Sequence, residues 1–172
     1  MREFRKGFGS FRIVVGMIAV SVMAGGSGHA FPRATTPMAS DSAVVGEIPK
    51  AALVEPAELS RLLANGPEKP LVLQVGSRVL FTEAHIVGSE YAGPGGQGSG
   101  LALLRTRMKD VKRNQAVVIY CGCCPWGKCP NIRAAYAALV GMGFTGVKAL
   151  YIEEDFGTDW VEKGYPVAKG AK

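Results

Sequence analysis

Residues 117–140, VVIYCGCCPWGKCPNIRAAYAALV, join an apolar segment, a loop that holds all four cysteines of the chain, and a helical pattern. Val117–Tyr120 is rich in β-branched side chains, which predicts a fully buried strand. Between Ile132 and Val140, apolar residues recur at the i, i+3, i+4 and i+7 spacing of a helix with one buried face, and Gly143 is expected to cap its end. The cysteines therefore lie where a buried strand passes into an amphipathic helix.

Segments of the same two kinds flank this unit on both sides. The predicted elements are a short helix around Leu59–Leu63 that stops at Gly66, strands at Leu71–Val75 and Val147–Ile152, and a last helix that starts with a capping box at Asp159 and Glu162 and ends at Gly164. Because strands alternate with helices, we expect an α/β fold in which helices flank a central, mainly parallel sheet.

The N-terminus has the pattern of a signal peptide. Four basic residues precede an uncharged apolar run, Ile13–Ala24, and small residues follow it up to Ala30. The run is shorter than the roughly 20 residues of a membrane-spanning helix, so an uncleaved anchor is the less favoured alternative. We predict a signal peptide of residues 1–30 that is removed after Ala30, a periplasmic or secreted protein, and no membrane contact after cleavage.

Charge and composition bound the rest of the chain. The chain has 20 Lys and Arg against 14 Asp and Glu, and the predicted mature part keeps 16 against 13. This mild excess does not favour nucleic acid binding, which usually needs a concentrated basic stripe. Residues 31–56 hold several Pro, Ser and Thr without an apolar period, so we predict a linker or arm there, followed by a single domain over residues 57–172.

The position of the cysteines predicts an anion site. In an open α/β sheet, loop N–H groups and helix N-termini gather at the carboxyl ends of the strands, and both favour a thiolate or persulfide. Pro130 suits the first position of the helix, which makes Cys129 the N-cap residue, where the helix dipole lowers a thiol pKa. Cys121, at the end of the strand, is expected to point into the loop, where Lys128 adds a positive charge.

Five motifs of the chain, in order, resemble landmarks of the rhodanese-like family. They are Leu71–Ser77, Ala84–Ser89, Val118–Cys121, Gly141–Leu150, and Trp160 with Gly164–Val167. The resemblance covers roughly residues 58–167. It implies a rhodanese-like three-layer α/β fold and sulfurtransferase activity, in which a cysteine takes sulfane sulfur from a donor, holds it as a persulfide and passes it to an acceptor.

The resemblance makes Cys121 the nucleophile. The sequence departs from the family where Gln74 and Gly76 replace its usual Asp and Arg, and in a longer loop whose extra cysteines make an internal disulfide and redox turnover possible. The predicted site comprises Cys121, Cys124 and Cys129 as catalytic residues, and Gly122, Cys123, Trp126, Gly127 and Lys128 as the loop that holds the substrate. The expected partners are a small sulfur donor or acceptor and a periplasmic thiol reductase, and no cofactor is predicted.

Three alternatives for the cysteines stay open. In an oxidising compartment an even number of cysteines often forms structural disulfides, although a bond that closes so short a loop gains little chain entropy. Compact thiolates also suit metal ions such as Cu(I) or zinc, in a binding or redox-sensing protein on an inactive rhodanese scaffold. Paired thiols fit an arsenate reductase. A related phosphatase is excluded, because its phosphate loop needs Arg six positions after the nucleophile, where Gly127 stands.

Other segments have plainer interpretations. The basic residues between Arg105 and Arg113 are expected to form a solvated helix face, with a minor role in attracting thiosulfate-like anions. Glu153–Asp155 is expected to be a solvated turn and His85 a structural residue. Gly93–Gly98 is expected to be a flexible loop, because the dinucleotide-binding pattern that it fits lacks the acidic residue that should follow.

Overall fold

The computed structural model describes residues 47–170, so the predicted signal peptide and most of the predicted arm lie outside the described residues. The elements are η1 (Lys50–Ala52), β1 (Leu53–Val54), α1 (Pro56–Asn65), β2 (Leu71–Gln74), α2 (Arg78–Glu83), β3 (His85–Ile86), β4 (Glu90–Tyr91), α3 (Gly98–Met108), β5 (Val117–Tyr120), η2 (Trp126–Lys128), α4 (Pro130–Gly141), β6 (Val147–Leu150), the π-helix η3 (Gly157–Val161) and β7 (Val167–Ala168). None of the helices within residues 47–170 is long and apolar enough to cross a membrane.

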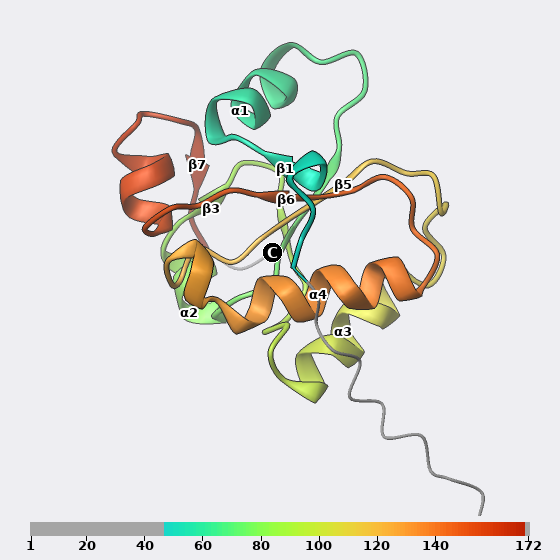
Figure 1. The fold of residues 1–172 in the computed structure, drawn as a ribbon. Coiled ribbons are helices and arrows are strands. Elements are labelled where there is room, and N and C mark those ends of the chain that lie inside the picture. Colours follow the sequence, from blue (N-terminus) through green and yellow to red (C-terminus); the bar gives the residue numbers. More distant parts are fainter. Residues whose placement is uncertain (1–46, 171–172) are drawn as a thin grey trace, which may run out of the picture. The chain divides into compact units, whose positions relative to one another are not determined.

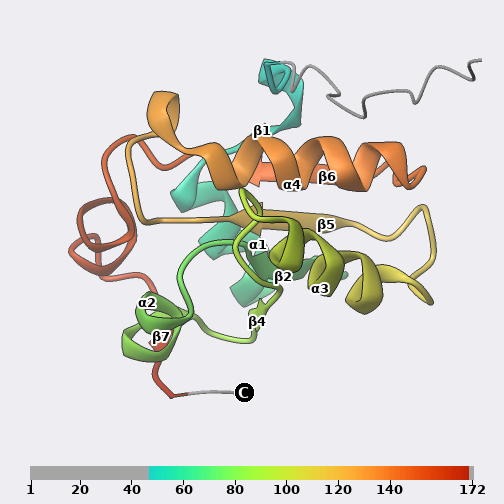
Figure 2. The ribbon, with the colours of Figure 1, turned by 90° about the horizontal axis from the view of Figure 1, so that it is seen from below.

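Five strands form one parallel sheet in the order β1-β6-β5-β2-β4, with β5 at its centre. Helix α1 lies on one face of the sheet, and α3 and α4 lie on the other (Figure 1). Figure 2 shows α3 and α4 side by side across that second face. A separate antiparallel pair is made by β3 and β7. This three-layer arrangement confirms the predicted fold class, a central, mainly parallel sheet flanked by helices.

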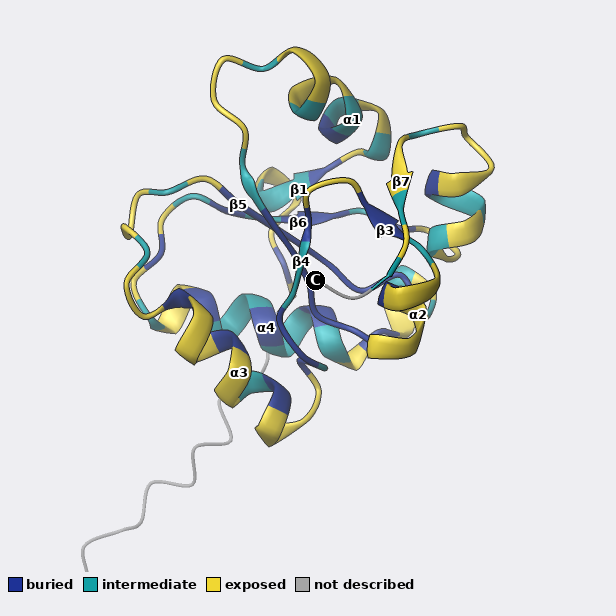
Figure 3. Cartoon of the chain, turned by 180° about the vertical axis from the view of Figure 1, so that it is seen from behind, coloured by how far each residue is buried: buried dark blue, intermediate teal, exposed yellow. Residues whose placement is uncertain are grey.

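Two apolar cores pack against the two faces of the sheet. Successive side chains of β5 alternate between them, because a strand directs neighbouring side chains to opposite faces. Val117 and Ile119 belong to the core that includes α3 and α4. Val118 and Tyr120 belong to the core that includes α1 and the π-helix. All four residues are buried, and β5 is dark blue in Figure 3, so the prediction of a fully buried strand is confirmed.

The longer apolar patterns form the elements that they predict. The two central strands begin at Val117 and Leu71, as expected. Helix α4 buries Ile132 and Leu139 and ends next to Gly143, whose φ of 85° is a left-handed conformation that glycine adopts without strain. Apolar periodicity is therefore sufficient to locate the strand and the helix on either side of the cysteines.

The folded domain begins earlier than predicted. Ile48 is buried, and β1 pairs with β6 so that Leu53 lies beside Ala149. Ile48 and β1 both lie in the segment 31–56, which we expected to be a linker or arm. A strand of two residues is too short to show an apolar period, so the sequence pattern could not reveal it.

The predicted start of the last helix is wrong. The chain forms a single π-helical turn that begins at Gly157, so Asp159 lies inside the turn. Its carboxylate accepts a hydrogen bond from the N–H of Glu154 at 2.8 Å and does not cap a helix that continues toward Glu162. Asp159 therefore uses its carboxylate for a local hydrogen bond to the preceding turn and not as a helix cap.

His85 has the structural role expected of it. Its side chain is buried, its ring stacks on Phe81 with centroids 4.0 Å apart, and its Nδ1 lies 2.8 Å from the Phe81 carbonyl oxygen. These contacts join α2 to β3 and involve none of the cysteines.

Candidate functional site

The carboxyl ends of β2 and β5 meet at one edge of the sheet, because the two strands are parallel with Gln74 beside Tyr120. Tyr120 is buried on one face, where its hydroxyl accepts a hydrogen bond from the Ile86 N–H at 3.2 Å. The next residue, Cys121, is buried on the other face, in the core that includes α4. The sheet thus places Cys121 at the edge where open α/β proteins bind their ligands.

The four cysteines, Cys121, Cys123, Cys124 and Cys129, bring their sulfur atoms together in what we call the cysteine cluster. All four Sγ atoms lie within 4.8 Å of one another, and no disulfide joins them. The Sγ atoms of Cys121 and Cys123 are 2.9 Å apart, and those of Cys123 and Cys124 are 3.3 Å apart. Because Cys121 and Cys129 are buried while Cys123 is exposed, the cluster reaches from the core to solvent.

Two glycines permit this close packing. Gly122 has a φ of 73°, a left-handed conformation that turns the chain directly after Cys121. A Cβ on Gly122 would lie 2.6 Å from the Cβ of Phe156. A Cβ on Gly76 would lie 2.8 Å from Cys121 Sγ. The Arg that the rhodanese-like resemblance would place at Gly76 therefore has no room beside this sulfur.

Asn131, in the first turn of α4, contacts the cluster directly. Its Nδ2 donates to Cys121 Sγ at 3.3 Å. Its Oδ1 accepts a hydrogen bond at 2.8 Å from the N–H of Gly96, in the segment that we expected to be a flexible loop. That segment is thus hydrogen-bonded to the site. No motif in the sequence indicated this role for Asn131, because it depends on a contact between distant segments.

Gln74 holds the backbone of the loop through hydrogen bonds of its side chain. Its side chain is buried, its Nε2 donates to the Cys121 carbonyl oxygen at 3.2 Å, and its Oε1 accepts from the Gly76 N–H at 3.2 Å. A carboxylate can only accept hydrogen bonds, whereas an amide donates and accepts at once. The amide therefore suits this position better than the Asp that the resemblance would place there.

The two buried thiols of the cluster differ in the direction of their pKa shifts. Hydrogen bonding from Cys121, aided by the backbone N–H of Ile132 and opposed by burial, lowers the pKa of Cys129 to about 5. The pKa of Cys121 is raised, because hydrogen bonding to Cys129 and burial both favour its neutral form. Burial, followed by contacts with Cys123, raises the pKa of Cys124 to about 12. At neutral pH the negative charge therefore rests on Cys129, which is the N-cap residue of α4 as predicted.

A cavity of about 370 Å³ opens beside Cys121. Its walls come from the ends of β2 and β5, from α2, and from the turn that leads into the π-helix. Cys121 and Cys123 line it, whereas Cys124 and Cys129 do not. Tyr120 and Phe156 add two aromatic rings with centroids 5.5 Å apart. Cys121 and Cys123 are thus the thiols that a small molecule in this cavity can touch.

The second half of the predicted loop lies away from this cavity. Trp126 packs its ring against Tyr151, with centroids 5.3 Å apart. Gly127 and Lys128 are exposed, and none of these three loop residues lines the cavity. The structure therefore brings the four cysteines and Gly122 together and leaves the other three predicted loop residues outside.

Comparison with known proteins supports the fold. No protein-family model matches the chain, and no curated protein matches it. Among solved structures, the BH2092 protein from Bacillus halodurans is 22% identical with a TM-score of 0.55, over 70% of this chain and 79% of that one. The Alr3790 protein from Anabaena sp. is 19% identical with a TM-score of 0.54, over 68% of this chain and 92% of that one.

The solution structure of the rhodanese-like domain of Alr3790 is 17% identical with a TM-score of 0.52, over 69% of this chain and 79% of that one. At these identities the similarity lies in the arrangement of helices and strands. The chain therefore contains a domain of the rhodanese-like fold, with a four-cysteine cluster at the carboxyl ends of its strands.

Proposed function

We propose that the chain is a rhodanese-like sulfurtransferase in which Cys121 takes up sulfane sulfur and Cys123 can release it. One observation carries the proposal: Cys121 lines the cavity and its Sγ lies 2.9 Å from Cys123 Sγ. A donor in the cavity can reach the first thiol. A movement of about 1 Å would bring the two sulfurs to the roughly 2.05 Å of a disulfide bond.

In the first step, the Cys129 thiolate acts as a general base and takes the proton of Cys121 while Cys121 Sγ attacks, so that no free Cys121 thiolate has to form beforehand. Cys121 Sγ attacks the outer sulfur of a donor persulfide, R–S–SH. A bond forms between Cys121 Sγ and that sulfur, the S–S bond of the donor breaks, and the donor leaves as the thiolate R–S⁻. The protein then carries Cys121–S–SH as a covalent intermediate.

The Cys121 persulfide can react further in two ways. An acceptor thiolate can attack the outer sulfur, which transfers the sulfur and releases the Cys121 sulfur, which is then protonated again. Alternatively, the Cys123 thiolate attacks Cys121 Sγ, a disulfide forms, and hydrosulfide, HS⁻, leaves. In that case the two thiols lose two electrons, and the sulfane sulfur gains them. Asn131 donates to Cys121 Sγ and can help to orient it in either route.

The second route leaves a disulfide that must be reduced before the next cycle. The predicted periplasmic location indicates which class of protein could reduce it. A dithiol protein of the periplasm would reduce the Cys121–Cys123 disulfide and become oxidised itself. The N-terminal pattern supports this location. N-terminal sequencing of the protein from the periplasmic fraction should find a chain that begins at Phe31, and an intact Met1 would remove the support.

The proposal is tested by treating the reduced full chain with cysteine persulfide and measuring the position of the added sulfur by peptide mass spectrometry. We expect the mass of one added sulfur atom on Cys121 in the wild type. Cys121→Ser should not gain it, whereas Cys123→Ser should gain it and keep it, because the resolving thiol is absent. An adduct that persists in Cys121→Ser would contradict the assignment.

Metal binding is a second candidate function, and the arrangement of the cluster favours it. Four sulfur atoms within 4.8 Å of one another can surround a single ion, and thiolates suit Cu(I) and zinc. Cys124 separates the two functions, because it belongs to the cluster but does not line the cavity. If the cluster holds metal, full chain purified without added metal should contain it, and Cys124→Ser should lose metal while keeping sulfur uptake. A metal-free protein that does not bind added Cu(I) would end this candidate.

A further inference from the structure

The charged side chains that line the cavity, its cysteines aside, are acidic. They are Glu83, at the end of α2, and Asp155, before the π-helix, and no Lys or Arg of residues 47–170 lines it. Both residues are exposed. The single ion pair among the described residues joins Arg107 to Glu90, so it neutralises neither carboxylate. The cavity therefore has a negative lining next to the reactive thiol.

The carboxylate of Asp155 is held in place within this lining. Its Oδ1 accepts a hydrogen bond from the Thr158 N–H at 2.9 Å, in the first turn of the π-helix. The Glu83 side chain has no hydrogen-bond partner among the described residues. One carboxylate is thus fixed and the other is free to adjust to a bound group.

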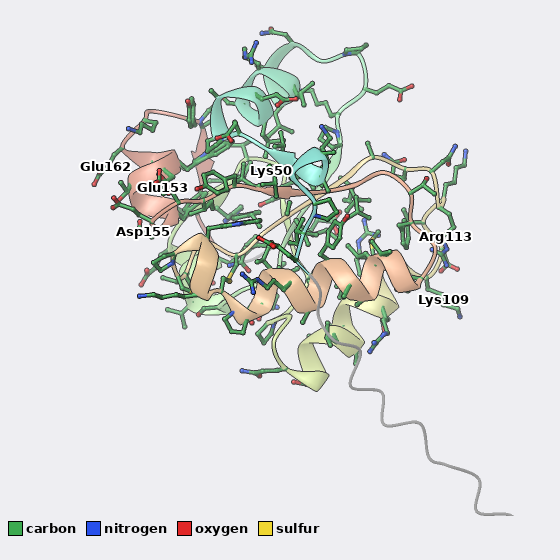
Figure 4. The ribbon with its side chains drawn as sticks, viewed as in Figure 1. Lys50, Lys109, Arg113, Glu153, Asp155 and Glu162 are labelled. Atoms are coloured by element: carbon green, nitrogen blue, oxygen red, sulfur yellow. The ribbon has the colours of Figure 1, made fainter. Side chains whose placement is uncertain are left out.

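The basic residues around Lys109 and Arg113 lie far from the acidic residues next to the cavity. Figure 4 shows Lys109 and Arg113 at one end, and Glu153, Asp155 and Glu162 at the opposite end. The solvated basic face that the sequence predicted therefore does not adjoin the cysteines. Because the lining of the cavity holds two carboxylates and no basic side chain, the lining itself does not attract an anion.

Basic residues do occur on segments next to the site, but none of them lines the cavity: Arg78, Lys128, Lys163 and Lys169. Arg78, in α2, lies with its guanidinium 4.5 Å from the centre of the Tyr91 ring, and it does not line the cavity. Lys128, which we expected to add a positive charge near the thiols, is exposed and does not line it either.

The uncharged walls suit a short hydrocarbon chain. Leu80 and Val161 line the cavity and are each 39% exposed, so their apolar side chains can contact a ligand there. The rings of Tyr120 and Phe156 also line it, and aromatic faces attract cations as well as apolar groups.

We propose that this site takes a small organic thiol or persulfide that carries a cationic amino group, and that anionic sulfur compounds such as thiosulfate are poor substrates. The inference rests on the proposed sulfur uptake at Cys121 and names its substrate class. The sulfur end reaches Cys121, the carbon chain lies along Leu80 and Val161, and the ammonium group pairs with Glu83 and Asp155. The site has no cation in its lining to pair with the charges of thiosulfate.

The test compares three donors of similar size that differ in charge: cysteamine persulfide (cationic), mercaptoethanol persulfide (neutral) and mercaptopropionate persulfide (anionic). The initial rate of sulfur addition to Cys121 in the full chain is measured by peptide mass spectrometry. We expect the cationic donor to react about tenfold faster than the anionic one, as two partly exposed charge pairs allow. The ratio should shrink at high salt, because exposed charges are screened.

Two variants assign the preference to the lining. Glu83→Gln and Asp155→Asn keep the size of each side chain and remove its charge, so each should reduce the rate ratio several-fold. Glu162→Gln is the matched control, because Glu162 is exposed at the same acidic end but does not line the cavity, and it should leave the ratio unchanged. Equal rates for the three donors in the wild type, or a faster anionic donor, would overturn the inference.

A second probe keeps the inference testable if no persulfide forms. Aminoethyl and sulfonatoethyl methanethiosulfonate form disulfides with any accessible thiol and carry opposite charges. Faster labelling of Cys121 and Cys123 by the aminoethyl reagent is expected. Failure of sulfur uptake together with this charge preference would refute only the proposed function, whereas uptake without a charge preference would refute only the substrate class.

Discussion

Cys121 and Cys129 mark the end of β5 and the start of α4, and they are almost equally buried, at 5% and 4% exposure. Their thiols nevertheless shift in opposite directions. The pKa of Cys121 is raised, whereas that of Cys129 is lowered to about 5. Burial opposes ionisation at both positions, so burial does not cause the difference.

The difference comes first from the hydrogen bond between the two thiols, which favours the neutral form of Cys121 and the ionised form of Cys129, and then from the backbone around Cys129. Cys129 precedes Pro130 at the N-cap of α4, where the N–H groups of Asn131 and Ile132 favour a negative charge. Cys121 follows a strand, and its hydrogen bond to Cys129 favours the protonated, neutral form of its thiol. One cluster thus holds a ready thiolate outside the cavity and a protonated thiol inside it, a division of roles that variants can test.

The largest expected effect is that of Cys129→Ser on the charge of the cluster. Because the folded pKa of Cys129 is lowered to about 5, the reduced wild type should hold one thiolate throughout the range from about pH 6 to pH 8, where an ordinary thiol of pKa about 8.5 is mostly protonated. Cys129→Ser should lose it. The ultraviolet absorbance of thiolates, followed as a function of pH, measures this directly.

Cys124→Ser is the control for that titration, because the pKa of Cys124 is raised and its thiol is neutral in the same range. Unfolding the wild type in denaturant at neutral pH should also remove the absorbance, since the helix N-terminus is lost. A wild type without thiolate absorbance below about pH 8 would contradict the assignment of the charge to Cys129.

Gly76→Ala should break the Cys121 side of the comparison. The new methyl group would lie 2.8 Å from Cys121 Sγ and 2.9 Å from its carbonyl oxygen. We expect a loss of about 1–3 kcal/mol in the free energy of unfolding, typical of an overpacked site. Sulfur uptake at Cys121 should slow, while the Cys129 thiolate should persist.

Gly127→Ala is the matched control in the same loop, because a Cβ at Gly127 has no neighbour within 4 Å. Denaturant unfolding should show little change for it. Equal stability of the two variants would mean that Gly76 does not limit the space around the sulfur.

Asn131→Ala should have a smaller effect, because it removes only weak hydrogen bonds to the sulfurs of Cys121 and Cys123 and one hydrogen bond to Gly96. We expect a cost of about 1 kcal/mol in stability and a several-fold slower uptake of sulfur. Asn131→Asp sharpens the test: it keeps an acceptor for the Gly96 N–H but adds a negative charge beside the thiols. The added charge should raise the pKa values of the thiols and slow the uptake of sulfur. The retained hydrogen bond to Gly96 should keep the loss of stability small.

Lys128→Gln should have the smallest effect. Lys128 is exposed and does not line the cavity, so stability should change by less than about 0.5 kcal/mol and the rate of sulfur uptake should stay the same. A marked loss of sulfur uptake would show that the ammonium group of Lys128 contributes to the reaction.

The sequence was enough to predict the architecture around the cysteines. Val117–Tyr120 and the apolar face of α4 are long, regular patterns, and they place Cys121 at a strand end and Cys129 at a helix start. Pro130 was enough to predict the N-cap position of Cys129, because proline favours the first turn of a helix.

The environment of the sulfurs was not predictable in the same way. The left-handed turn at Gly122, the contact of Asn131 with Cys121, and the carboxylates of Glu83 and Asp155 in the cavity wall depend on segments far apart in the chain. Trp126 was included among the loop residues predicted to hold the substrate because it lies in the loop, but position in a loop does not determine where a side chain points, and its ring packs on Tyr151.

The most direct test of the central claim is to measure the hydrosulfide that the reduced full chain releases after a single exposure to cysteine persulfide, with no other thiol present. If Cys121 binds the sulfur and Cys123 resolves it, the wild type should release one hydrosulfide per chain and acquire a Cys121–Cys123 disulfide, and Cys123→Ser should retain the sulfur on Cys121. Release of hydrosulfide from Cys121→Ser at the wild-type level would contradict the account.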